Sequence, residues 1–170
     1  MEGKNYINGA FVDGTSGDRF ESRNPANFDE ILGTFPLSSE QDVNNAVRAA
    51  KTAYDGWRRL SRIKRGEHFD EFVQLLKKDR EEISRLVTKE CGKGIVEGRA
   101  DVTEGIHMVQ YTFGTVRMPH GDVVDSEIPE KDAFMRRKPK GVVAAISPWN
   151  FPFAIPLWLL CPSVVEGNTV

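Results

Sequence analysis

The residues best suited to chemistry lie in one short segment, residues 147–152 (SPWNFP). The segment follows five consecutive apolar residues, 142–146, which suit a parallel strand buried on both faces. In open α/β sheets ligands bind outside the carboxyl ends of the strands, where such a loop lies. Two prolines restrict the backbone around Trp149 and Asn150. This rigidity suits a site that must hold one polar amide in a set direction.

The same residues also fit a purely structural role. Trp149 would then fill the core, and Asn150 would make an ordinary turn hydrogen bond. The spacing alone favours this second interpretation.

The chain has two cysteines and three histidines, and none has the spacing of a metal or catalytic cluster. Cys91 is expected to end a helix and Cys161 to lie on an apolar helix, so both are interpreted as small packing residues. The histidines are scattered at His68, His107 and His120 and are expected to be solvated or hydrogen-bonded. No metal site is predicted.

Two further signals imitate ligand sites. Residues 92–98 (GKGIVEG) almost spell a dinucleotide fingerprint, but the last glycine comes one position late and the segment follows a helix. Lys93 is interpreted as a surface charge at a helix end. The basic run at residues 58–65 is interpreted as a solvated helix face in preference to a phosphate site.

The elements that would position the loop begin with β structure. Residues 6–12 (YINGAFV) place an Asn-Gly pair between apolar residues, which predicts a tight hairpin. Phe20 and residues 31–35 predict further short strands, separated by a turn at Asn24-Pro25.

Apolar residues at steps of three and four then predict four amphipathic helices. The first begins near Ser38, which has capping-box spacing to Gln41. The third is expected to be capped by Asp79 and ended by Gly92. The helices form a layer that needs a partner surface, and their apolar positions fall within residues 43–57, 63–76, 83–87 and 102–113.

The C-terminal part mixes both kinds of element. Residues 122–125 and 133–137 predict a polar hairpin, which is either a solvated loop or a strand that pairs with another subunit. A helix is expected over residues 153–166, and residues 168–170 resemble the beginning of another strand. With residues 142–146 they make a βαβ unit that stops as its second strand begins, so the chain is interpreted as incomplete.

Residues 140–152 (KGVVAAISPWNFP) resemble the block of the aldehyde dehydrogenase superfamily that ends in Pro-Trp-Asn-Phe-Pro. Cys91 stands where the family's Glu-Thr-Gly-Lys block has Thr. The similarity covers nearly the whole chain in the family's order, with weaker matches at residues 6–9 (YING), 24–26 (NPA), 90–93 (ECGK) and 166–170 (EGNTV).

The resemblance implies an α/β fold, the N-terminal part of the family's Rossmann-like cofactor-binding domain, with an N-terminal β-hairpin, a helical layer and a β arm. Residues 1–117 and 139–170 would form the partial cofactor-binding domain. Residues 118–138 would form an oligomerisation arm, and a homo-oligomer is expected through it.

The resemblance also implies an enzyme that oxidises an aldehyde, a small molecule, to a carboxylic acid with NAD or NADP. Asn150 would be catalytic, as the oxyanion-hole donor whose side-chain amide stabilises the substrate oxygen. The cofactor pocket would be lined, partly through backbone atoms, by Ile146, Ser147, Pro148 and Trp149.

The family's cofactor-binding lysine, nucleophilic cysteine and general-base glutamate are expected beyond Val170. The 170 residues alone are therefore predicted to be inactive. Two alternatives remain: a non-catalytic piece that only folds or assembles with the parent enzyme, and a cofactor-binding module without chemistry.

Composition limits the partners. A net charge of −2 gives no long-range field for nucleic acid or an anionic membrane. The N-terminus lacks the apolar core of a signal peptide, and the longest apolar stretch, residues 151–161, is too short to span a bilayer. Together with the cysteine usage, these features favour a reducing cytosolic or organelle-matrix setting, and a cytoplasmic location is expected.

Overall fold

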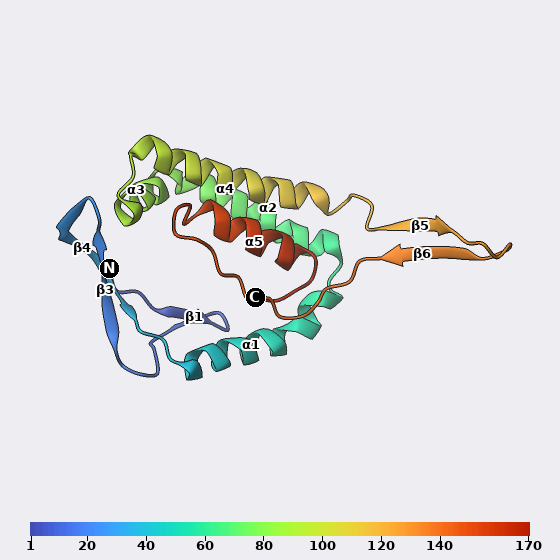
Figure 1. Cartoon of the computed structure of the whole chain (residues 1–170), viewed down its shortest axis with the longest axis horizontal. Helices are drawn as coiled ribbons and strands as arrows, with labels where there is room; N and C mark the ends of the chain where they lie inside the picture. Colours follow the sequence, from blue (N-terminus) through green and yellow to red (C-terminus); the bar gives the residue numbers. More distant parts are fainter.

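The computed structural model describes all residues, 1–170, as three antiparallel hairpins and five helices. The helices form the body of the molecule, and one hairpin projects away from it (Figure 1). No helix is long and apolar enough to cross a membrane. The hairpins are β1 (Asn5–Ile7) with β2 (Ala10–Val12), β3 (Arg19–Asn24) with β4 (Asn27–Pro36), and β5 (Gly121–Asp125) with β6 (Asp132–Arg136). The helices are α1 (Glu40–Arg59), α2 (Arg62–Lys78), α3 (Arg80–Cys91), α4 (Ile95–Thr115) and α5 (Ala154–Val165).

The N-terminal β structure confirms the sequence prediction. Asn8 and Gly9, between β1 and β2, have φ of 54° and 77°. Positive φ at both central residues is what a two-residue turn of type I′ requires, and Asn-Gly supplies it at low cost. The β3–β4 hairpin turns at Pro25 and Ala26, as expected.

The capping prediction for α1 is wrong by one residue. The N-cap is Ser39, not Ser38, and its capping-box partner is Asp42, not Gln41. The Asp42 carboxylate accepts hydrogen bonds from the Ser39 amide at 2.8 Å and from the Thr15 amide at 3.1 Å. It therefore joins the helix start to the preceding loop, a tertiary contact that local spacing does not contain.

The limits of α3 are only partly as predicted. Gly92 ends it in the left-handed conformation, with φ of 67°. Asp79 is its N-cap, but the Asp79 side chain makes no capping hydrogen bond. Because Asp79 also ends α2, its backbone (φ −96°, ψ 9°) is not the extended conformation from which a capping side chain reaches the helix amides.

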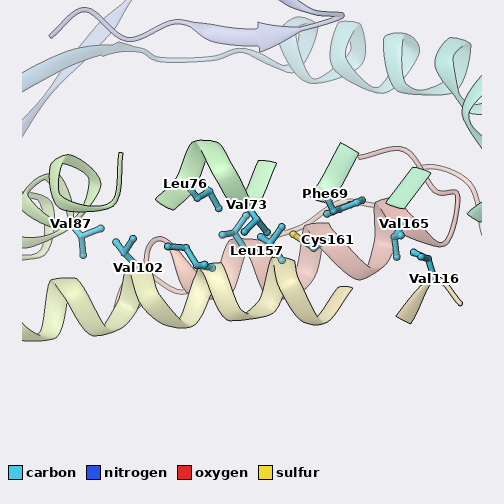
Figure 2. Close-up of a cluster of buried hydrophobic side chains, with 11 residues drawn as sticks. Phe69, Val73, Leu76, Val87, Val102, Val116, Leu157, Cys161 and Val165 are labelled. Atoms are coloured by element: carbon cyan, nitrogen blue, oxygen red, sulfur yellow. The ribbon is translucent and has the colours of Figure 1, made fainter. Parts of the chain in front are cut away.

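The hydrophobic core lies where α4 packs against α2, α3 and α5. Figure 2 shows its side chains gathered between these helices, with Leu157 and Cys161 of α5 facing α2 and α4. Val102 and Val109 of α4 are completely buried. The partner surface that the helical layer needs is therefore supplied largely by α5.

The predicted buried strand at residues 142–146 is not formed, which corrects the sequence analysis. Val142 makes one parallel bridge with Thr169, and the Val143 amide donates to the Thr169 carbonyl at 2.8 Å. The following residues have no strand partner, and Ile146 is 92% exposed. A parallel strand needs neighbours and a cover on both faces, and within these 170 residues only the segment around Thr169 lies beside it.

The Rossmann-like parallel sheet is accordingly absent from the described chain, whose sheets are all two-stranded and antiparallel. The coarser α/β assignment, with an N-terminal hairpin, a helical layer and a projecting hairpin, is confirmed. The helix expected over residues 153–166 is α5, and Gly167 follows it with φ of 99°.

The projecting β5–β6 hairpin has the predicted strands but a different surface. It was expected to be polar, yet Val123 and Phe134 lie opposite each other on neighbouring strands and are 81% and 79% exposed. Isolated two-stranded hairpins are at best marginally stable in water. This apolar pair therefore makes the hairpin suited to contact another surface.

Truncation of Leu157 tests the role of α5 in the core. Leu157→Ala is expected to lower the free energy of unfolding by about 2–5 kcal/mol, because it leaves a cavity among closely packed side chains. Leu159→Ala, on the same helix at a position that is 38% exposed, is the control and should cost less than about 1 kcal/mol. Urea denaturation measures both, and equal losses would contradict this description of the core.

Candidate functional site

One open cavity of about 730 Å³ is lined by three segments that are far apart in the sequence. They are the turn after β3, the end of α3 with the beginning of α4, and the loop before α5. The lining residues are Pro25, Glu90, Cys91, Lys93, Glu97, Ala100, Trp149, Asn150, Phe151 and Pro152.

Gly92 brings the first two segments together. A Cβ atom at this position would lie 2.9 Å from Cγ of Pro25 and 3.2 Å from the amide nitrogen of Ala26. Its φ of 67° is in the left-handed region as well. Only glycine meets both requirements without strain, so the end of α3 can lie directly against the Asn24-Pro25 turn.

The loop of residues 146–150 is displayed on the surface. Ile146 and Trp149 are 92% and 87% exposed, Pro148 and Asn150 are exposed, and Ser147 is half-buried. Trp149 and Asn150 line the cavity, whereas Ile146, Ser147 and Pro148 do not. The structural interpretation of Trp149 as a core residue is therefore wrong.

The loop is held in place through two of its main-chain carbonyl groups. The carbonyl oxygen of Asn150 accepts a hydrogen bond from Nζ of Lys93 at 2.9 Å, and the carbonyl of Trp149 accepts one from Sγ of Cys91 at 3.5 Å. The Lys93 side chain is only 15% exposed. Its interpretation as a surface charge at a helix end is therefore wrong: Lys93 points inward and binds the loop.

A buried carboxylate completes this arrangement. Asp101 of α4 is completely buried, and its Oδ2 lies 3.4 Å from Nζ of Lys93. Its Oδ1 accepts a hydrogen bond from the amide of Ala154 at 2.8 Å, at the start of α5. Asp101 thus joins α4 to both ends of the segment that carries Asn150.

The sequence analysis missed Lys93 and Asp101, although a signal for Asp101 was present. Asp101 lies on the same face of α4 as Gly98, Gly105 and Val102, at helical spacing, and these residues are buried. A carboxylate on a buried helix face needs a cationic or hydrogen-bonding partner. Lys93, eight residues earlier, was a candidate for that partner.

The thiols do not have the character of nucleophiles. Burial raises the pKa of the Cys161 thiol to about 12, and Cys161 is 3% exposed in the core. Burial also raises the pKa of Cys91 above its ordinary value. Both thiols are therefore protonated at neutral pH. The interpretation as a packing residue is confirmed for Cys161, whereas Cys91 lines the cavity and contacts the loop.

The basic run at the α1–α2 corner is not simply a solvated face. Arg65 is buried and donates through Nε to the carbonyl of Val165 at 2.8 Å. Arg62 pairs with Glu166 at 2.5 Å, and Glu166 also contacts Nε2 of His120 at 2.7 Å. These groups attach the corner to the end of α5. The interpretation as a solvated face is therefore wrong for Arg62 and Arg65, whereas Arg58, Arg59 and Lys64 are exposed as expected. Nowhere in the structure do three or more His, Cys, Asp or Glu side chains gather as metal ligands would.

Comparison with known proteins gives a consistent family. The model of the aldehyde dehydrogenase family matches residues 11–170. The chain belongs to the aldehyde dehydrogenase family. It is 39% identical over 166 residues to an alpha-ketoglutaric semialdehyde dehydrogenase of Bacillus subtilis, and 40% identical over 167 residues to a malonate-semialdehyde dehydrogenase of Lacticaseibacillus casei. Each match covers 98% of this chain and 34% of the relative.

The fold agrees with this family. The crystal structure of an NAD-dependent aldehyde dehydrogenase from Sinorhizobium meliloti matches with a TM-score of 0.93 and 30% identity, over 100% of this chain and 34% of that one. The chain thus spans about a third of the length of the aldehyde dehydrogenases it matches. Other similar structures were solved with NAD bound.

Several of the short sequence blocks that resemble the aldehyde dehydrogenase family lie close together in the structure. The same cavity is lined by residues that are far apart in the sequence: Pro25 of the Asn-Pro-Ala block, Glu90, Cys91 and Lys93 of the next block, and Trp149-Asn150. Asn168 of the last block accepts hydrogen bonds through Oδ1 from the amides of Lys140 and Gly141, at 2.6 and 3.0 Å. The Asn168 side chain therefore fixes the segment that leads into the loop.

Alkylation tests the state of the two thiols. In the folded protein at neutral pH, iodoacetamide should modify Cys161 and Cys91 slowly, because the pKa of each is raised and little thiolate is present. The Cys91 rate should rise with pH and should still be rising above about 9, where the rate of a thiol with the ordinary pKa levels off. Mass spectrometry measures the modification, and the denatured protein, in which both should react readily, is the control. Rapid labelling of folded Cys161 would contradict its buried position.

Proposed function

We propose that this chain supplies the N-terminal third of an enzyme that oxidises an aldehyde to a carboxylic acid with NAD or NADP. Membership of the aldehyde dehydrogenase family supports this, as does the NAD dependence named for the S. meliloti structure. The observation that carries the proposal is the position of Asn150. Its side chain is exposed at the rim of the cavity, while its main-chain carbonyl is held by Lys93.

In this proposal Asn150 is the catalytic residue of the chain. Its side-chain amide would donate a hydrogen bond to the substrate oxygen as negative charge develops there. A fixed main chain suits this role, because a donor that is already oriented needs no reorganisation during the reaction.

Residues 146–149 would hold the cofactor, which accepts a hydride from the substrate when bound. The loop fits such a ligand in two ways. Ile146 and Trp149 present exposed apolar surface, and the backbone amides of Ile146, Ser147, Trp149 and Asn150 donate no hydrogen bond within the chain. Apolar contacts with a few free polar groups are typical of cofactor pockets.

The substrate class we propose is a semialdehyde. The curated relatives from B. subtilis and L. casei, at 39% and 40% identity, are both named as semialdehyde dehydrogenases. An assay of the protein produced by its source cells with a panel of semialdehydes and simple alkyl aldehydes tests this choice.

The hairpin of residues 118–138 is proposed as an oligomerisation arm, beside a partial cofactor-binding domain of residues 1–117 and 139–170. The exposed pair Val123 and Phe134 supports a homo-oligomer, because large apolar side chains on a projecting hairpin gain stability when another subunit covers them. We also propose a cytoplasmic location, which the cysteine usage described in the sequence analysis supports.

Two other functions remain as alternatives. The chain could be a non-catalytic piece that folds or assembles with the parent enzyme, or a cofactor-binding module without chemistry. Titration of the 170-residue chain with NAD and NADP distinguishes them, because only the module requires measurable cofactor binding by this chain alone.

The 170-residue chain alone is expected to have no dehydrogenase activity, because Cys161 is buried in the core and Cys91 donates to the main chain of the loop, so neither takes the part of the family's nucleophilic cysteine. The measurement is NADH or NADPH formation from an aldehyde by the purified chain. The protein as its source cells produce it is the comparison and should be active. Turnover by the 170-residue chain would contradict the assignment of the cysteines.

Removal of the proposed oxyanion donor tests the role of Asn150. In the active protein, Asn150→Ala is expected to lower kcat by roughly 100- to 1,000-fold, because a hydrogen bond made to the developing charge is lost. The KM for NAD or NADP should change little. Asn44→Ala, at an exposed position of α1, is the matched control and should leave kcat unchanged. A wild-type kcat for Asn150→Ala would remove the residue from the mechanism.

A further inference from the structure

The segment between α3 and α4 holds two consecutive carbonyl groups of the loop before α5. Cys91 and Lys93, on either side of Gly92, reach the carbonyl oxygens of Trp149 and Asn150 at 3.5 and 2.9 Å. The left-handed Gly92 separates the two side chains where the helix ends. A single helix end thus contacts the loop at the residue proposed to be catalytic and at the one before it.

Of these two contacts, the one from Lys93 is strongly determined. Its ammonium group donates to Asn150, lies 3.4 Å from Oδ2 of Asp101 and lies 4.7 Å from the centre of the Phe151 ring. Lysine side chains on a surface rotate freely, but a carboxylate, a carbonyl and an aromatic face together leave this ammonium one position.

Asp101 extends the constraint to the other side of the loop. Its second oxygen accepts from the amide of Ala154, so one buried carboxylate holds Ala154 directly and Asn150 through Lys93. Phe151, between them, accepts a hydrogen bond from the amide of Ile155 at 3.3 Å. The main chain of residues 150–155 is therefore fixed at both ends, while the Asn150 side chain is left exposed towards the cavity.

We propose that Lys93, held by Asp101, is a positioning residue that fixes the main chain of Asn150 and thereby the direction of its side-chain amide. This inference rests on the role proposed for Asn150. Lys93 acts through Asn150 and does not touch the substrate. An error of about 1 Å in the placement of a catalytic group can lower a rate on the order of 100-fold, so a residue of this kind has a measurable effect.

The test compares variants of the protein as its source cells produce it. Lys93→Met removes the ammonium group and is expected to lower kcat about 10- to 100-fold, the range typical of residues that orient a functional group. The KM for the cofactor should stay within about twofold, because Lys93 lies outside the loop proposed to bind it. Lys93→Arg, which can still donate to the carbonyl and pair with Asp101, should recover most of the lost kcat.

Lys89→Met is the matched control. Lys89 lies one helical turn before Lys93 and pairs with Glu30 on the surface, where its side chain is 51% exposed. It should leave kcat unchanged. Should Lys93→Met fail to fold, Lys93→Gln takes its place, since it keeps a donor but not the charge and should show the same direction of change.

Hydrogen exchange supplies a readout that does not depend on catalysis. The amides of Ala154 and Ile155 report on the acceptors Asp101 and Phe151, and both should exchange faster in Lys93→Met than in the wild type or Lys89→Met. Unaltered exchange together with an unaltered kcat would overturn the proposal.

A lower melting temperature with an unchanged kcat of the folded protein would also overturn it, because Lys93 would then be only structural. If the wild-type protein oxidises no aldehyde, the proposed function fails, and the exchange rates of Ala154 and Ile155 still decide whether Lys93 fixes the loop.

Discussion

The carboxylate of Asp101 is completely buried, and the arrangement of the rest of the site depends on the groups that pair with it. A buried carboxylate is tolerated only when it is paired and hydrogen-bonded, and breaking a buried pair costs roughly 3–5 kcal/mol. Asp101 has two partners, Lys93 and the amide of Ala154. Meeting this requirement fixes α4, the start of α5 and the segment after α3 relative to one another.

The glycines of α4 allow this close packing. A Cβ atom at Gly105 would lie 2.6 Å from the ring of Phe153, and one at Gly98 would lie 2.8 Å from the carbonyl oxygen of Ser84. Larger residues would push α5 and α3 outward and separate Asp101 from its partners. Residues that cost helix stability in isolation thus contribute to the site through the distances they permit.

The sequence was sufficient where structure is local. Apolar spacing located the helices, Asn8-Gly9 located a turn and Gly92 a helix end, because each depends on neighbours within a few residues. The prediction of a buried strand at residues 142–146 failed because a strand depends on distant neighbours. The composition of these residues indicates a buried strand, but a strand exists only beside another, and Thr169 alone lies beside it here.

The site shows the same division. Trp149 and Asn150 were identifiable from a specific motif, and the structure places both at the cavity. Lys93 was misread because a lysine at a helix end is usually solvated, and its partners, Asn150 and Asp101, are 57 and 8 residues away. A contact between residues 57 positions apart leaves no periodic trace in one sequence. A carboxylate on a buried helix face was the one local clue.

The exposed apolar residues indicate where this surface makes further contacts. Among the large hydrophobic side chains the four most exposed are Ile146, Trp149, Val123 and Phe134, at 92%, 87%, 81% and 79%. They occur in two places, the loop proposed to hold the cofactor and the projecting hairpin. Burial of each is worth roughly 1.5–3 kcal/mol, a gain that the chain alone does not make and that a covering ligand or subunit would supply. The loop, which is exposed and yet held by Lys93, is suited to binding, because its order does not have to be created when a ligand covers it.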